Sequence, residues 1–278
     1  MFPTNKPHVS YSEIRTWKEC PYRHKLRYID GLDLDDVSQY LDYGTLLHSC
    51  LEEYLKTRQL NVEKLKADIT KAWSERGYDT PEYIERLTEK AAARGEDPRI
   101  LPKLNTWLEW AENSVTHVPE FLDTNFPNWT LISAEEQLYE KLPGDDLSFK
   151  GFIDVVIECD YRGGRKTWVL DWKTAPAYGW NAYKRRDFLV SAQIALYKKF
   201  WRAKNNVECK DVGCGFVLLK RGAKKNHVDL FTESGGPKTE EKADKLLRSM
   251  VKTVRKGLYL KNRNSCKYCP FYNTKHCT

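Results

Sequence analysis

The chain has 278 residues, of which 41% are hydrophobic and 31% charged, and its formal net charge is +7. This composition excludes a disordered chain, and no apolar run approaches the ~20 residues that a membrane span needs. A basic balance suits a polyanionic partner such as nucleic acid. Because the first twenty residues hold no apolar signal core, we expect a cytoplasmic protein.

The first third of the chain has helical patterns. In residues 10–28 we expect Ser10 or Ser12 to cap a helix and Pro21 to break or restart it. Residues 42–58 have the apolar spacing of an amphipathic helix, and the pattern stays helical and charged over about 60–120.

The apolar period then shortens to two residues, which is typical of strands. The pattern predicts strands over 129–142, 147–159 and 166–174, a helix over 188–204, strands over 211–221 and 226–233, and a basic helix over 239–257 capped by Thr239. A mixed sheet with helices on both sides fits this order, so the fold class is α/β.

One strand ends in a charged triplet, Asp171-Trp172-Lys173. Because residues two apart in a strand share a face, Asp171 and Lys173 should lie side by side with Trp172 turned into the core. Taken alone, the triplet favours an exposed ion pair, because D-x-K is common by chance. However, Asp154 lies in an apolar run of the preceding strand, where an unpaired carboxylate is costly. Two acids on adjacent strands predict a site for Mg²⁺ or Mn²⁺.

Four short motifs follow one another along the chain: Gly44 to His48 (G-x-x-x-H), Gly151 to Asp154 (G-x-x-D), Asp171 to Lys173 (D-x-K) and Gln193 to Tyr197 (Q-x-x-x-Y). Together they resemble the RecB-like subgroup of the PD-(D/E)xK nucleases. The resemblance implies a restriction-endonuclease-like fold with a helical insertion. It also implies hydrolysis of phosphodiester bonds with one or two bound Mg²⁺ or Mn²⁺ ions.

The resemblance also assigns roles to residues. His48, Asp154 and Asp171 correspond to metal ligands, the backbone carbonyl of Trp172 to a further ligand, and Lys173 to the catalytic lysine.

Four further positions are less definite. Gln193 and Tyr197 lie one helical turn apart and would support the site, although they could be ordinary surface and core residues. A glutamate on the strand before Asp154 is expected to contribute, and either Glu135 or Glu136 fits. Cys50, close to His48, is more simply a buried small residue than a ligand.

The tail contains Cys266, Cys269 and Cys277, and Cys20 stands near the start. These four resemble the ligands of a structural [4Fe–4S] cluster in RecB-like nucleases of the AddB and CRISPR-associated types, where the cluster joins the N- and C-termini. The seven residues between Cys269 and Cys277 are more than the resemblance implies. Zinc, with His276 as an added ligand, is the alternative. The remaining cysteines, 159, 209 and 214, are expected to be buried thiols.

These inferences converge on a metal-dependent DNA nuclease, specifically an exonuclease that prefers single strands or free ends and acts in recombination, repair or DNA processing. A phage origin and a protein partner or homo-oligomer are consistent with it. The alternative is a DNA-end-binding subunit of a recombination or spacer-acquisition complex without cleavage of its own. We expect one folded domain built from an N-terminal segment (1–40), a helical region (41–128), the nuclease core (129–235) and a C-terminal helix with cysteines (236–278).

Overall fold

The computed structural model describes residues 2–34, 38–93, 95 and 103–278. Its elements are β1 (His8–Ser10), α1 (Tyr11–Glu19), α2 (Pro21–His24), a π-helical turn (Lys25–Ile29), α3 (Gln39–Thr57), α4 (Val62–Arg76), α5 (Pro81–Ala93), α6 (Leu104–Thr116), α7 (Val118–Asn125), β2 (Thr130–Lys141), β3 (Ser148–Tyr161), β4 (Gly164–Pro176), α8 (Ala182–Arg186), α9 (Phe188–Asn205), a 3₁₀ turn (Cys209–Asp211), β5 (Val212–Arg221), β6 (Val228–Glu233), α10 (Pro237–Arg255) and a second 3₁₀ turn (Arg263–Tyr268). Within these residues no helix is long and apolar enough to cross a membrane.

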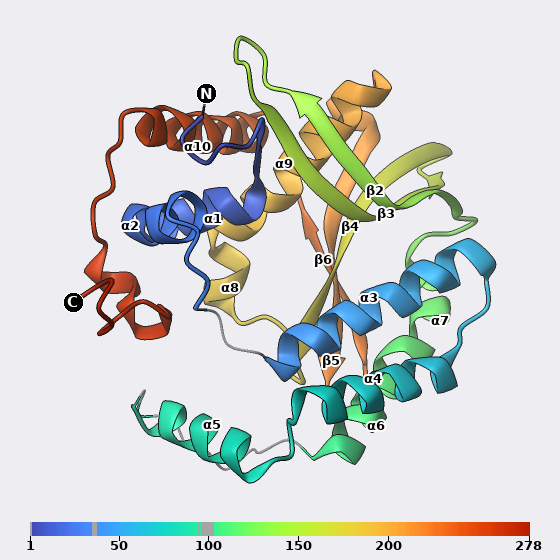
Figure 1. Cartoon of the computed structure of the whole chain (residues 1–278). Helices are drawn as coiled ribbons and strands as arrows, with labels where there is room; N and C mark the ends of the chain where they lie inside the picture. The colour runs from blue at the N-terminus through green and yellow to red at the C-terminus, as the bar shows by residue number, and fades with distance from the viewer. Residues whose placement is uncertain (1, 35–37, 94, 96–102) are drawn as a thin grey trace.

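A mixed six-stranded sheet forms the centre, in the order β1-β3-β4-β5-β6, with β2 also paired to β3. Helices α1, α9 and α10 pack on one face, and α3, α4, α6 and α7 pack on the other (Figure 1). Strands β2, β3 and β4 form an antiparallel meander, whereas β4 and β5 run parallel because α9 connects them across the sheet. The predicted α/β fold with helices on both faces is confirmed.

The turn between β3 and β4 illustrates how local sequence sets this arrangement. Arg162 and Gly163 both have positive φ angles, 49° and 80°, which is the backbone of a two-residue hairpin that follows the strand twist. Tyr161 pairs directly with Gly164 across the turn. This turn therefore fixes the register between β3 and β4. The same register sets the positions of Asp154 and Asp171 relative to each other.

One expectation about helix boundaries is confirmed and another is wrong. The helix from residue 10 is capped by Ser10 and ends at Glu19, and Pro21 begins a new helix, which is the expected restart. Helix α10 begins at Pro237, before Thr239, and its N-cap Gly236 has no side chain to donate or accept a bond. Proline suits this first helical position because its missing N–H would have no partner there.

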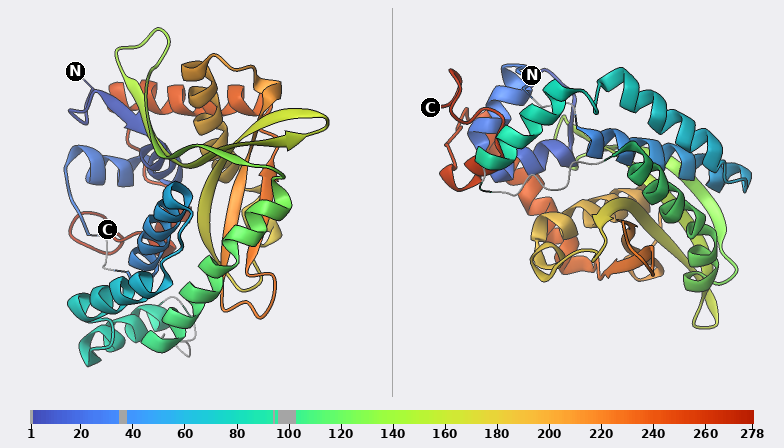
Figure 2. Two further views of the ribbon diagram at one scale, coloured as in Figure 1. Left: turned by 90° about the vertical axis from the view of Figure 1, so that its right-hand side faces the viewer. Right: turned by 90° about the horizontal axis from the view of Figure 1, so that it is seen from below.

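The two ends of the chain meet. Tyr22 N donates to Leu260 O (3.2 Å), and Tyr22 Oη donates to His276 O (3.2 Å). Leu26, Phe271 and Cys277 form a small hydrophobic cluster of their own. Figures 1 and 2 show the C-terminal segment, in red, beside α2. The division into four segments at residues 40, 128 and 235 stays a prediction.

Candidate metal centre

The centre lies where strand β3 loses its neighbour on one edge. Along that edge β1 pairs with residues 148–150 and β4 pairs with residues 155–161, which leaves residues 151–154 between them unpaired. Asp154 is the last residue of this gap. On the facing strand, Asp171 comes directly after Leu170, the final partner of Val155. The two acids therefore stand where β3 and β4 separate.

Asp154 is held by groups from two other elements. It is only 7% exposed, and its Oδ2 accepts a hydrogen bond from the backbone N–H of Trp172 at 2.6 Å. Its Oδ1 lies 3.3 Å from Nδ1 of His48 on α3. The Trp172 side chain is 1% exposed on the opposite face of β4, as the alternation predicts. The buried carboxylate is thus oriented by a peptide group and an imidazole.

Glu135 completes a group of three donors. Ala134 pairs with Val155 and Glu136 with Ile153, so Glu135 and Asp154 stand opposite one another on β2 and β3. Donor atoms of His48, Glu135 and Asp154 all lie within 4.8 Å of one another. Glu135 also has a φ of 50°, a strained conformation for a residue with a Cβ.

Glu136, the other candidate, points elsewhere. Its carboxylate accepts hydrogen bonds from Trp201 Nε1 (2.9 Å) and Lys204 Nζ (2.7 Å), both on α9. The geometry therefore favours Glu135 over Glu136. The sequence leaves the choice open because simple alternation cannot foresee the strained turn of the backbone at Glu135.

The alternation of side chains along β3 also reverses between Ile153 and Val155. Ile153 packs in the hydrophobic layer under α9, whereas Val155, two residues later, packs in the layer under α3. In a regular strand both would face the same way. The strained backbone at Glu135 lies opposite this reversal in β3. As a result the Asp154 carboxylate lies at the edge of the sheet and not inside either hydrophobic layer.

Asp171 is buried, 3% exposed, and its two carboxylate oxygens contact different side chains. Its Oδ1 accepts a bond from Gln193 Nε2 at 3.2 Å, and Gln193 lies 3.5 Å from the hydroxyl of Tyr197. Its Oδ2 is in ion-pair contact with Lys173 Nζ but accepts no well-directed hydrogen bond. The face shared by Asp171 and Lys173 is as the sequence predicts.

Electrostatics concentrate on these carboxyl groups. Burial, together with the charge of Asp154, raises the pKa of Glu135 to about 7. Burial likewise raises the pKa of Asp171 to about 6, with Lys173 opposing the shift and Asp154 adding to it. Burial disfavours the charged form of His48, but the bond and charge of Asp154 outweigh it and raise the pKa. Crowded carboxyl groups that resist ionisation are a setting in which a cation would bind favourably.

Three details add to or differ from the sequence interpretation. Glu52, one turn after His48 on α3, adds its charge to the shift at Glu135, and the i,i+4 spacing from His48 could have indicated it. At Gly44 a Cβ would meet only Thr174 at 4.0 Å, so steric crowding does not require this glycine. Asp171 is not in the group of three donors within 4.8 Å, and the carbonyl of Trp172 as a ligand stays a prediction.

A second site gathers the four predicted cysteines. Cys20, Cys266, Cys269 and Cys277 line one narrow cavity between α2 and the tail, and among the described residues none of the four forms a disulfide. Asn262 fastens this region, since its N–H donates to Cys20 Sγ at 3.3 Å.

The other cysteines follow the prediction in part. Cys50, Cys159 and Cys214 are buried, whereas Cys209 is only half-buried in its 3₁₀ turn. His276 is not among the residues that line the cavity between α2 and the tail.

Comparison with known proteins agrees with this geometry. A family model described as the PD-(D/E)XK nuclease superfamily matches residues 8–274. The chain belongs to this superfamily. The match spans both the candidate metal centre and the first three of the four cavity-lining cysteines, Cys20, Cys266 and Cys269, so the nuclease fold accounts for nearly the whole chain.

A solved structure is similar in fold. It is the crystal structure of a protein from Eubacterium rectale named "Putative exonuclease", with a TM-score of 0.56 and 12% identity, covering 97% of this chain and 89% of that one. At this identity the likeness concerns the fold of this PD-(D/E)XK nuclease. No curated protein matches the sequence.

Proposed function

We propose that this nuclease is a RecB-like, metal-dependent DNA exonuclease. The observation that carries the proposal is the convergence of His48, Glu135 and Asp154, with Lys173 beside Asp171 at the same strand end. These donors come from α3, β2 and β3, and nothing in ordinary packing requires three ionisable groups to meet there. A structural ion pair alone would leave Glu135 without a counter-charge.

The donor set fits a divalent cation. Carboxylate oxygens suit Mg²⁺ or Mn²⁺, and Asp171 Oδ2 is a buried oxygen without a directed hydrogen bond. We assign His48, Glu135, Asp154 and Asp171 to hold the metal. When bound, the metal would supply Lewis-acid activation of water and stabilise charge on the phosphate.

The protein's own groups prepare the substrate. Lys173 carries a positive charge on the face of Asp171, from which it can offset charge that develops on the scissile phosphate. Gln193 holds the Asp171 carboxylate from α9, and Tyr197 stands behind Gln193. These two are positioning residues, since the carboxylate separates them from the reacting atoms.

A preference for single strands is supported by exposed aromatic residues that follow β4, the strand that carries Asp171 and Lys173. Tyr178 comes two residues after β4 and Tyr183 lies in the short helix α8, and they are 77% and 89% exposed. Lys184, Arg185 and Arg186 complete the short helix α8 next to them. Solvent-exposed rings beside cationic side chains suit unstacked bases and a phosphate backbone. A duplex would keep its bases stacked and leave these rings without a role.

A [4Fe–4S] cluster is the proposed occupant of the cysteine cavity. Four thiols from the two ends of the chain line this one cavity, and Arg23, Lys261 and Arg263 around it can offset the negative charge of a cluster. Zinc is the alternative occupant. We propose a structural role in which the cluster joins the chain ends, within a DNA-processing or repair setting in the cytoplasm.

The proposal is tested by cleavage of end-labelled single-stranded and duplex DNA with Mn²⁺. The wild-type protein should shorten single strands from an end, whereas Asp171→Asn and Lys173→Met should each lose at least about 100-fold in rate. The ladder of products gives the polarity. If the wild-type protein binds DNA ends without cutting them, the end-binding subunit replaces the nuclease as the assigned function.

A further inference from the structure

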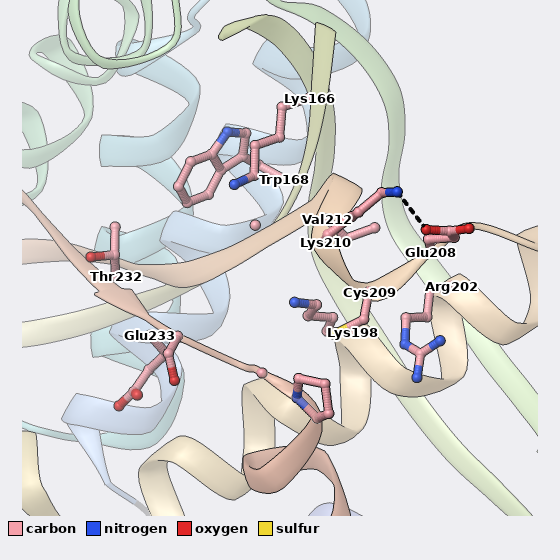
Figure 3. Close-up of a pocket in the computed structure, with 14 residues that line it drawn as sticks. Lys166, Trp168, Lys198, Arg202, Glu208, Cys209, Lys210, Val212, Thr232 and Glu233 are labelled. Carbon is pink, nitrogen blue, oxygen red and sulfur yellow. Dashed lines mark ion pairs between the residues drawn. The ribbon is translucent and has the colours of Figure 1, made fainter. Parts of the chain in front are cut away.

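A cavity of about 860 Å³ opens at the start of β5, and none of its lining residues belongs to the candidate metal centre. It forms because β6 stops short of the start of β5. The last pair between them is Cys214 with Glu233, so Val212 and Gly213 extend beyond β6. The end of α9 and the start of α10 close the other side (Figure 3).

Lys198 is the unusual residue of this cavity. It lies on α9, is only 2% exposed, and forms no ion pair or hydrogen bond with any described residue. Figure 3 shows its side chain among the lining residues, between Glu233 on one side and Arg202 on the other. A Cβ added at Gly235 would lie 2.5 Å from Cys214 Sγ and 3.2 Å from Lys198 Cδ, so the glycine leaves space chiefly for Cys214 and also for the stem of this lysine.

The carboxylates nearby are engaged with other groups. Glu233 accepts a hydrogen bond from Ser191 Oγ at 2.8 Å. Glu240 accepts two bonds from Arg202 Nε, at 2.9 and 3.2 Å, and a third from its Nη2. A buried ammonium without a counter-charge is unfavourable. An anion arriving from the cavity would provide the missing partner.

The amino end of α10 faces the same space. Gly236 and Pro237 line the cavity. Pro237 has no N–H, and Thr239 and Glu240 donate theirs to Gly236 O at 2.8 and 3.0 Å, so among the described residues Lys238 is left as the free backbone donor of this turn. Because α10 has 19 residues, its amino end carries the partial positive charge of a full helix dipole. The positive end of a helix dipole and an unpaired lysine together form surroundings in which a phosphate binds favourably.

Charge and size indicate the class of ligand. Besides Lys198, three cationic side chains line the cavity (Lys166, Arg202 and Lys210), against two acidic ones (Glu208 and Glu233). A single phosphate would leave most of the volume empty, whereas sites for nucleotide-sized molecules span roughly 300–1,000 Å³. The half-buried indole of Trp168 offers an apolar wall. We propose that this cavity binds a phosphorylated small molecule of nucleotide size, with its phosphate between Lys198 and the amino end of α10.

Calorimetric titration of inorganic phosphate and of dAMP tests the proposal, in a buffer without phosphate, sulfate or divalent ions. We expect saturable binding of both to the wild-type protein, with dAMP the tighter ligand. Lys198→Met should weaken both about 10- to 100-fold, because it removes a charge-assisted bond. Lys242→Met, which removes an exposed lysine of α10, is the matched control and should keep the wild-type affinity.

Thermal melting without ligand provides the check on folding. Lys198→Met should melt at a higher temperature than the wild type, since it removes a buried charge that lacks a partner. Lys198→Gln, neutral and of similar length, serves if the methionine variant does not fold. Unchanged affinity in the Lys198 variants, no saturable binding to the wild type, or equal affinity for phosphate and dAMP would each overturn the assignment. Because divalent ions are absent, the outcome does not depend on DNA cleavage.

Discussion

Replacing Gly151 by alanine should disturb the candidate metal centre from a distance. A Cβ at this position would lie 2.8 Å from Cε1 of Tyr197 and 3.3 Å from Cε1 of Phe149. Ordinary contacts begin at 3.4 Å, so the Tyr197 ring would have to move by about 0.6 Å, the difference between 3.4 and 2.8. Tyr197 is buried and packs against Phe149, so this space is not freely available.

Two quantities should change together. Overpacking of this kind costs about 1–3 kcal/mol, and each kcal/mol lowers the melting temperature of a chain of this size by about 2–4 °C. Tyr197 lies 3.5 Å from Gln193, which holds Asp171, so a displaced ring should also misplace the carboxylate. Misplacement by several tenths of an ångström at a reacting group should cost about 10- to 100-fold in rate.

The assay is a comparison of melting temperature and single-turnover cleavage for four proteins: wild type, Gly151→Ala, Tyr197→Leu and the double variant. The smaller leucine makes room for the new Cβ, so the double variant should be more stable than the sum of the single effects predicts. Gly164→Ala, whose Cβ would meet only Tyr161 O at 4.0 Å, is the control and should be nearly neutral. Additive effects, or a Gly151→Ala protein with wild-type stability, would refute the reasoning.

Three further outcomes are expected. Cys20→Ala should bleach any brown colour and lower solubility, whereas Cys159→Ala should keep the visible absorption spectrum; a full cluster in the first variant would contradict the ligand assignment. Tyr183→Ala should weaken single-stranded DNA binding about 5- to 100-fold without changing the melting temperature, and an unchanged dissociation constant would argue against base stacking. Arg255, which donates two bonds of 2.8 Å to Asp145, lowers the pKa of that carboxyl to about 2. A lowered pKa stabilises the fold above about pH 4, so Asp145→Asn should cost about 1 kcal/mol at pH 7, after allowance for solvent screening, and roughly half of that at pH 3 in urea titrations. A cost that is constant with pH would show that the ion pair is not its source.

Much of the fold could be predicted because period and turn chemistry are local properties. The strands of the meander, the hairpin at Gly163 and the helix that carries Gln193 all follow from alternation, positive-φ residues and apolar spacing. Strand β1 could not be predicted, since three residues give no period and their pairing with β3 joins segments about 140 residues apart. The start of α10 was missed because a hydroxyl at Thr239 resembles a cap, while Pro237 already begins the helix.

The residues of the candidate site likewise fall into those that local sequence reveals and those that depend on the tertiary structure. The motif residues His48, Asp154, Asp171 and Lys173 could be named because their types and spacing are visible in the sequence. The choice of Glu135 over Glu136 depends on a strained backbone angle that no pattern announces. Lys198 was overlooked for a similar reason, since a lysine in a helix is normally solvated and only the tertiary packing buries it.

The hydrogen bond from Trp172 N to Asp154 determines which residue types position 172 can accept. The peptide N–H of Trp172 makes the contact to the Asp154 carboxylate, and the indole packs in the core beneath α3. Side chains of similar bulk should therefore be interchangeable there without any chemical penalty, provided that the core stays filled. Proline is the exception, because it has no N–H to donate. In a library of variants at this position, the accepted side chains would reflect how well they fill the core. The catalytic requirement for an N–H would be visible only as the absence of proline.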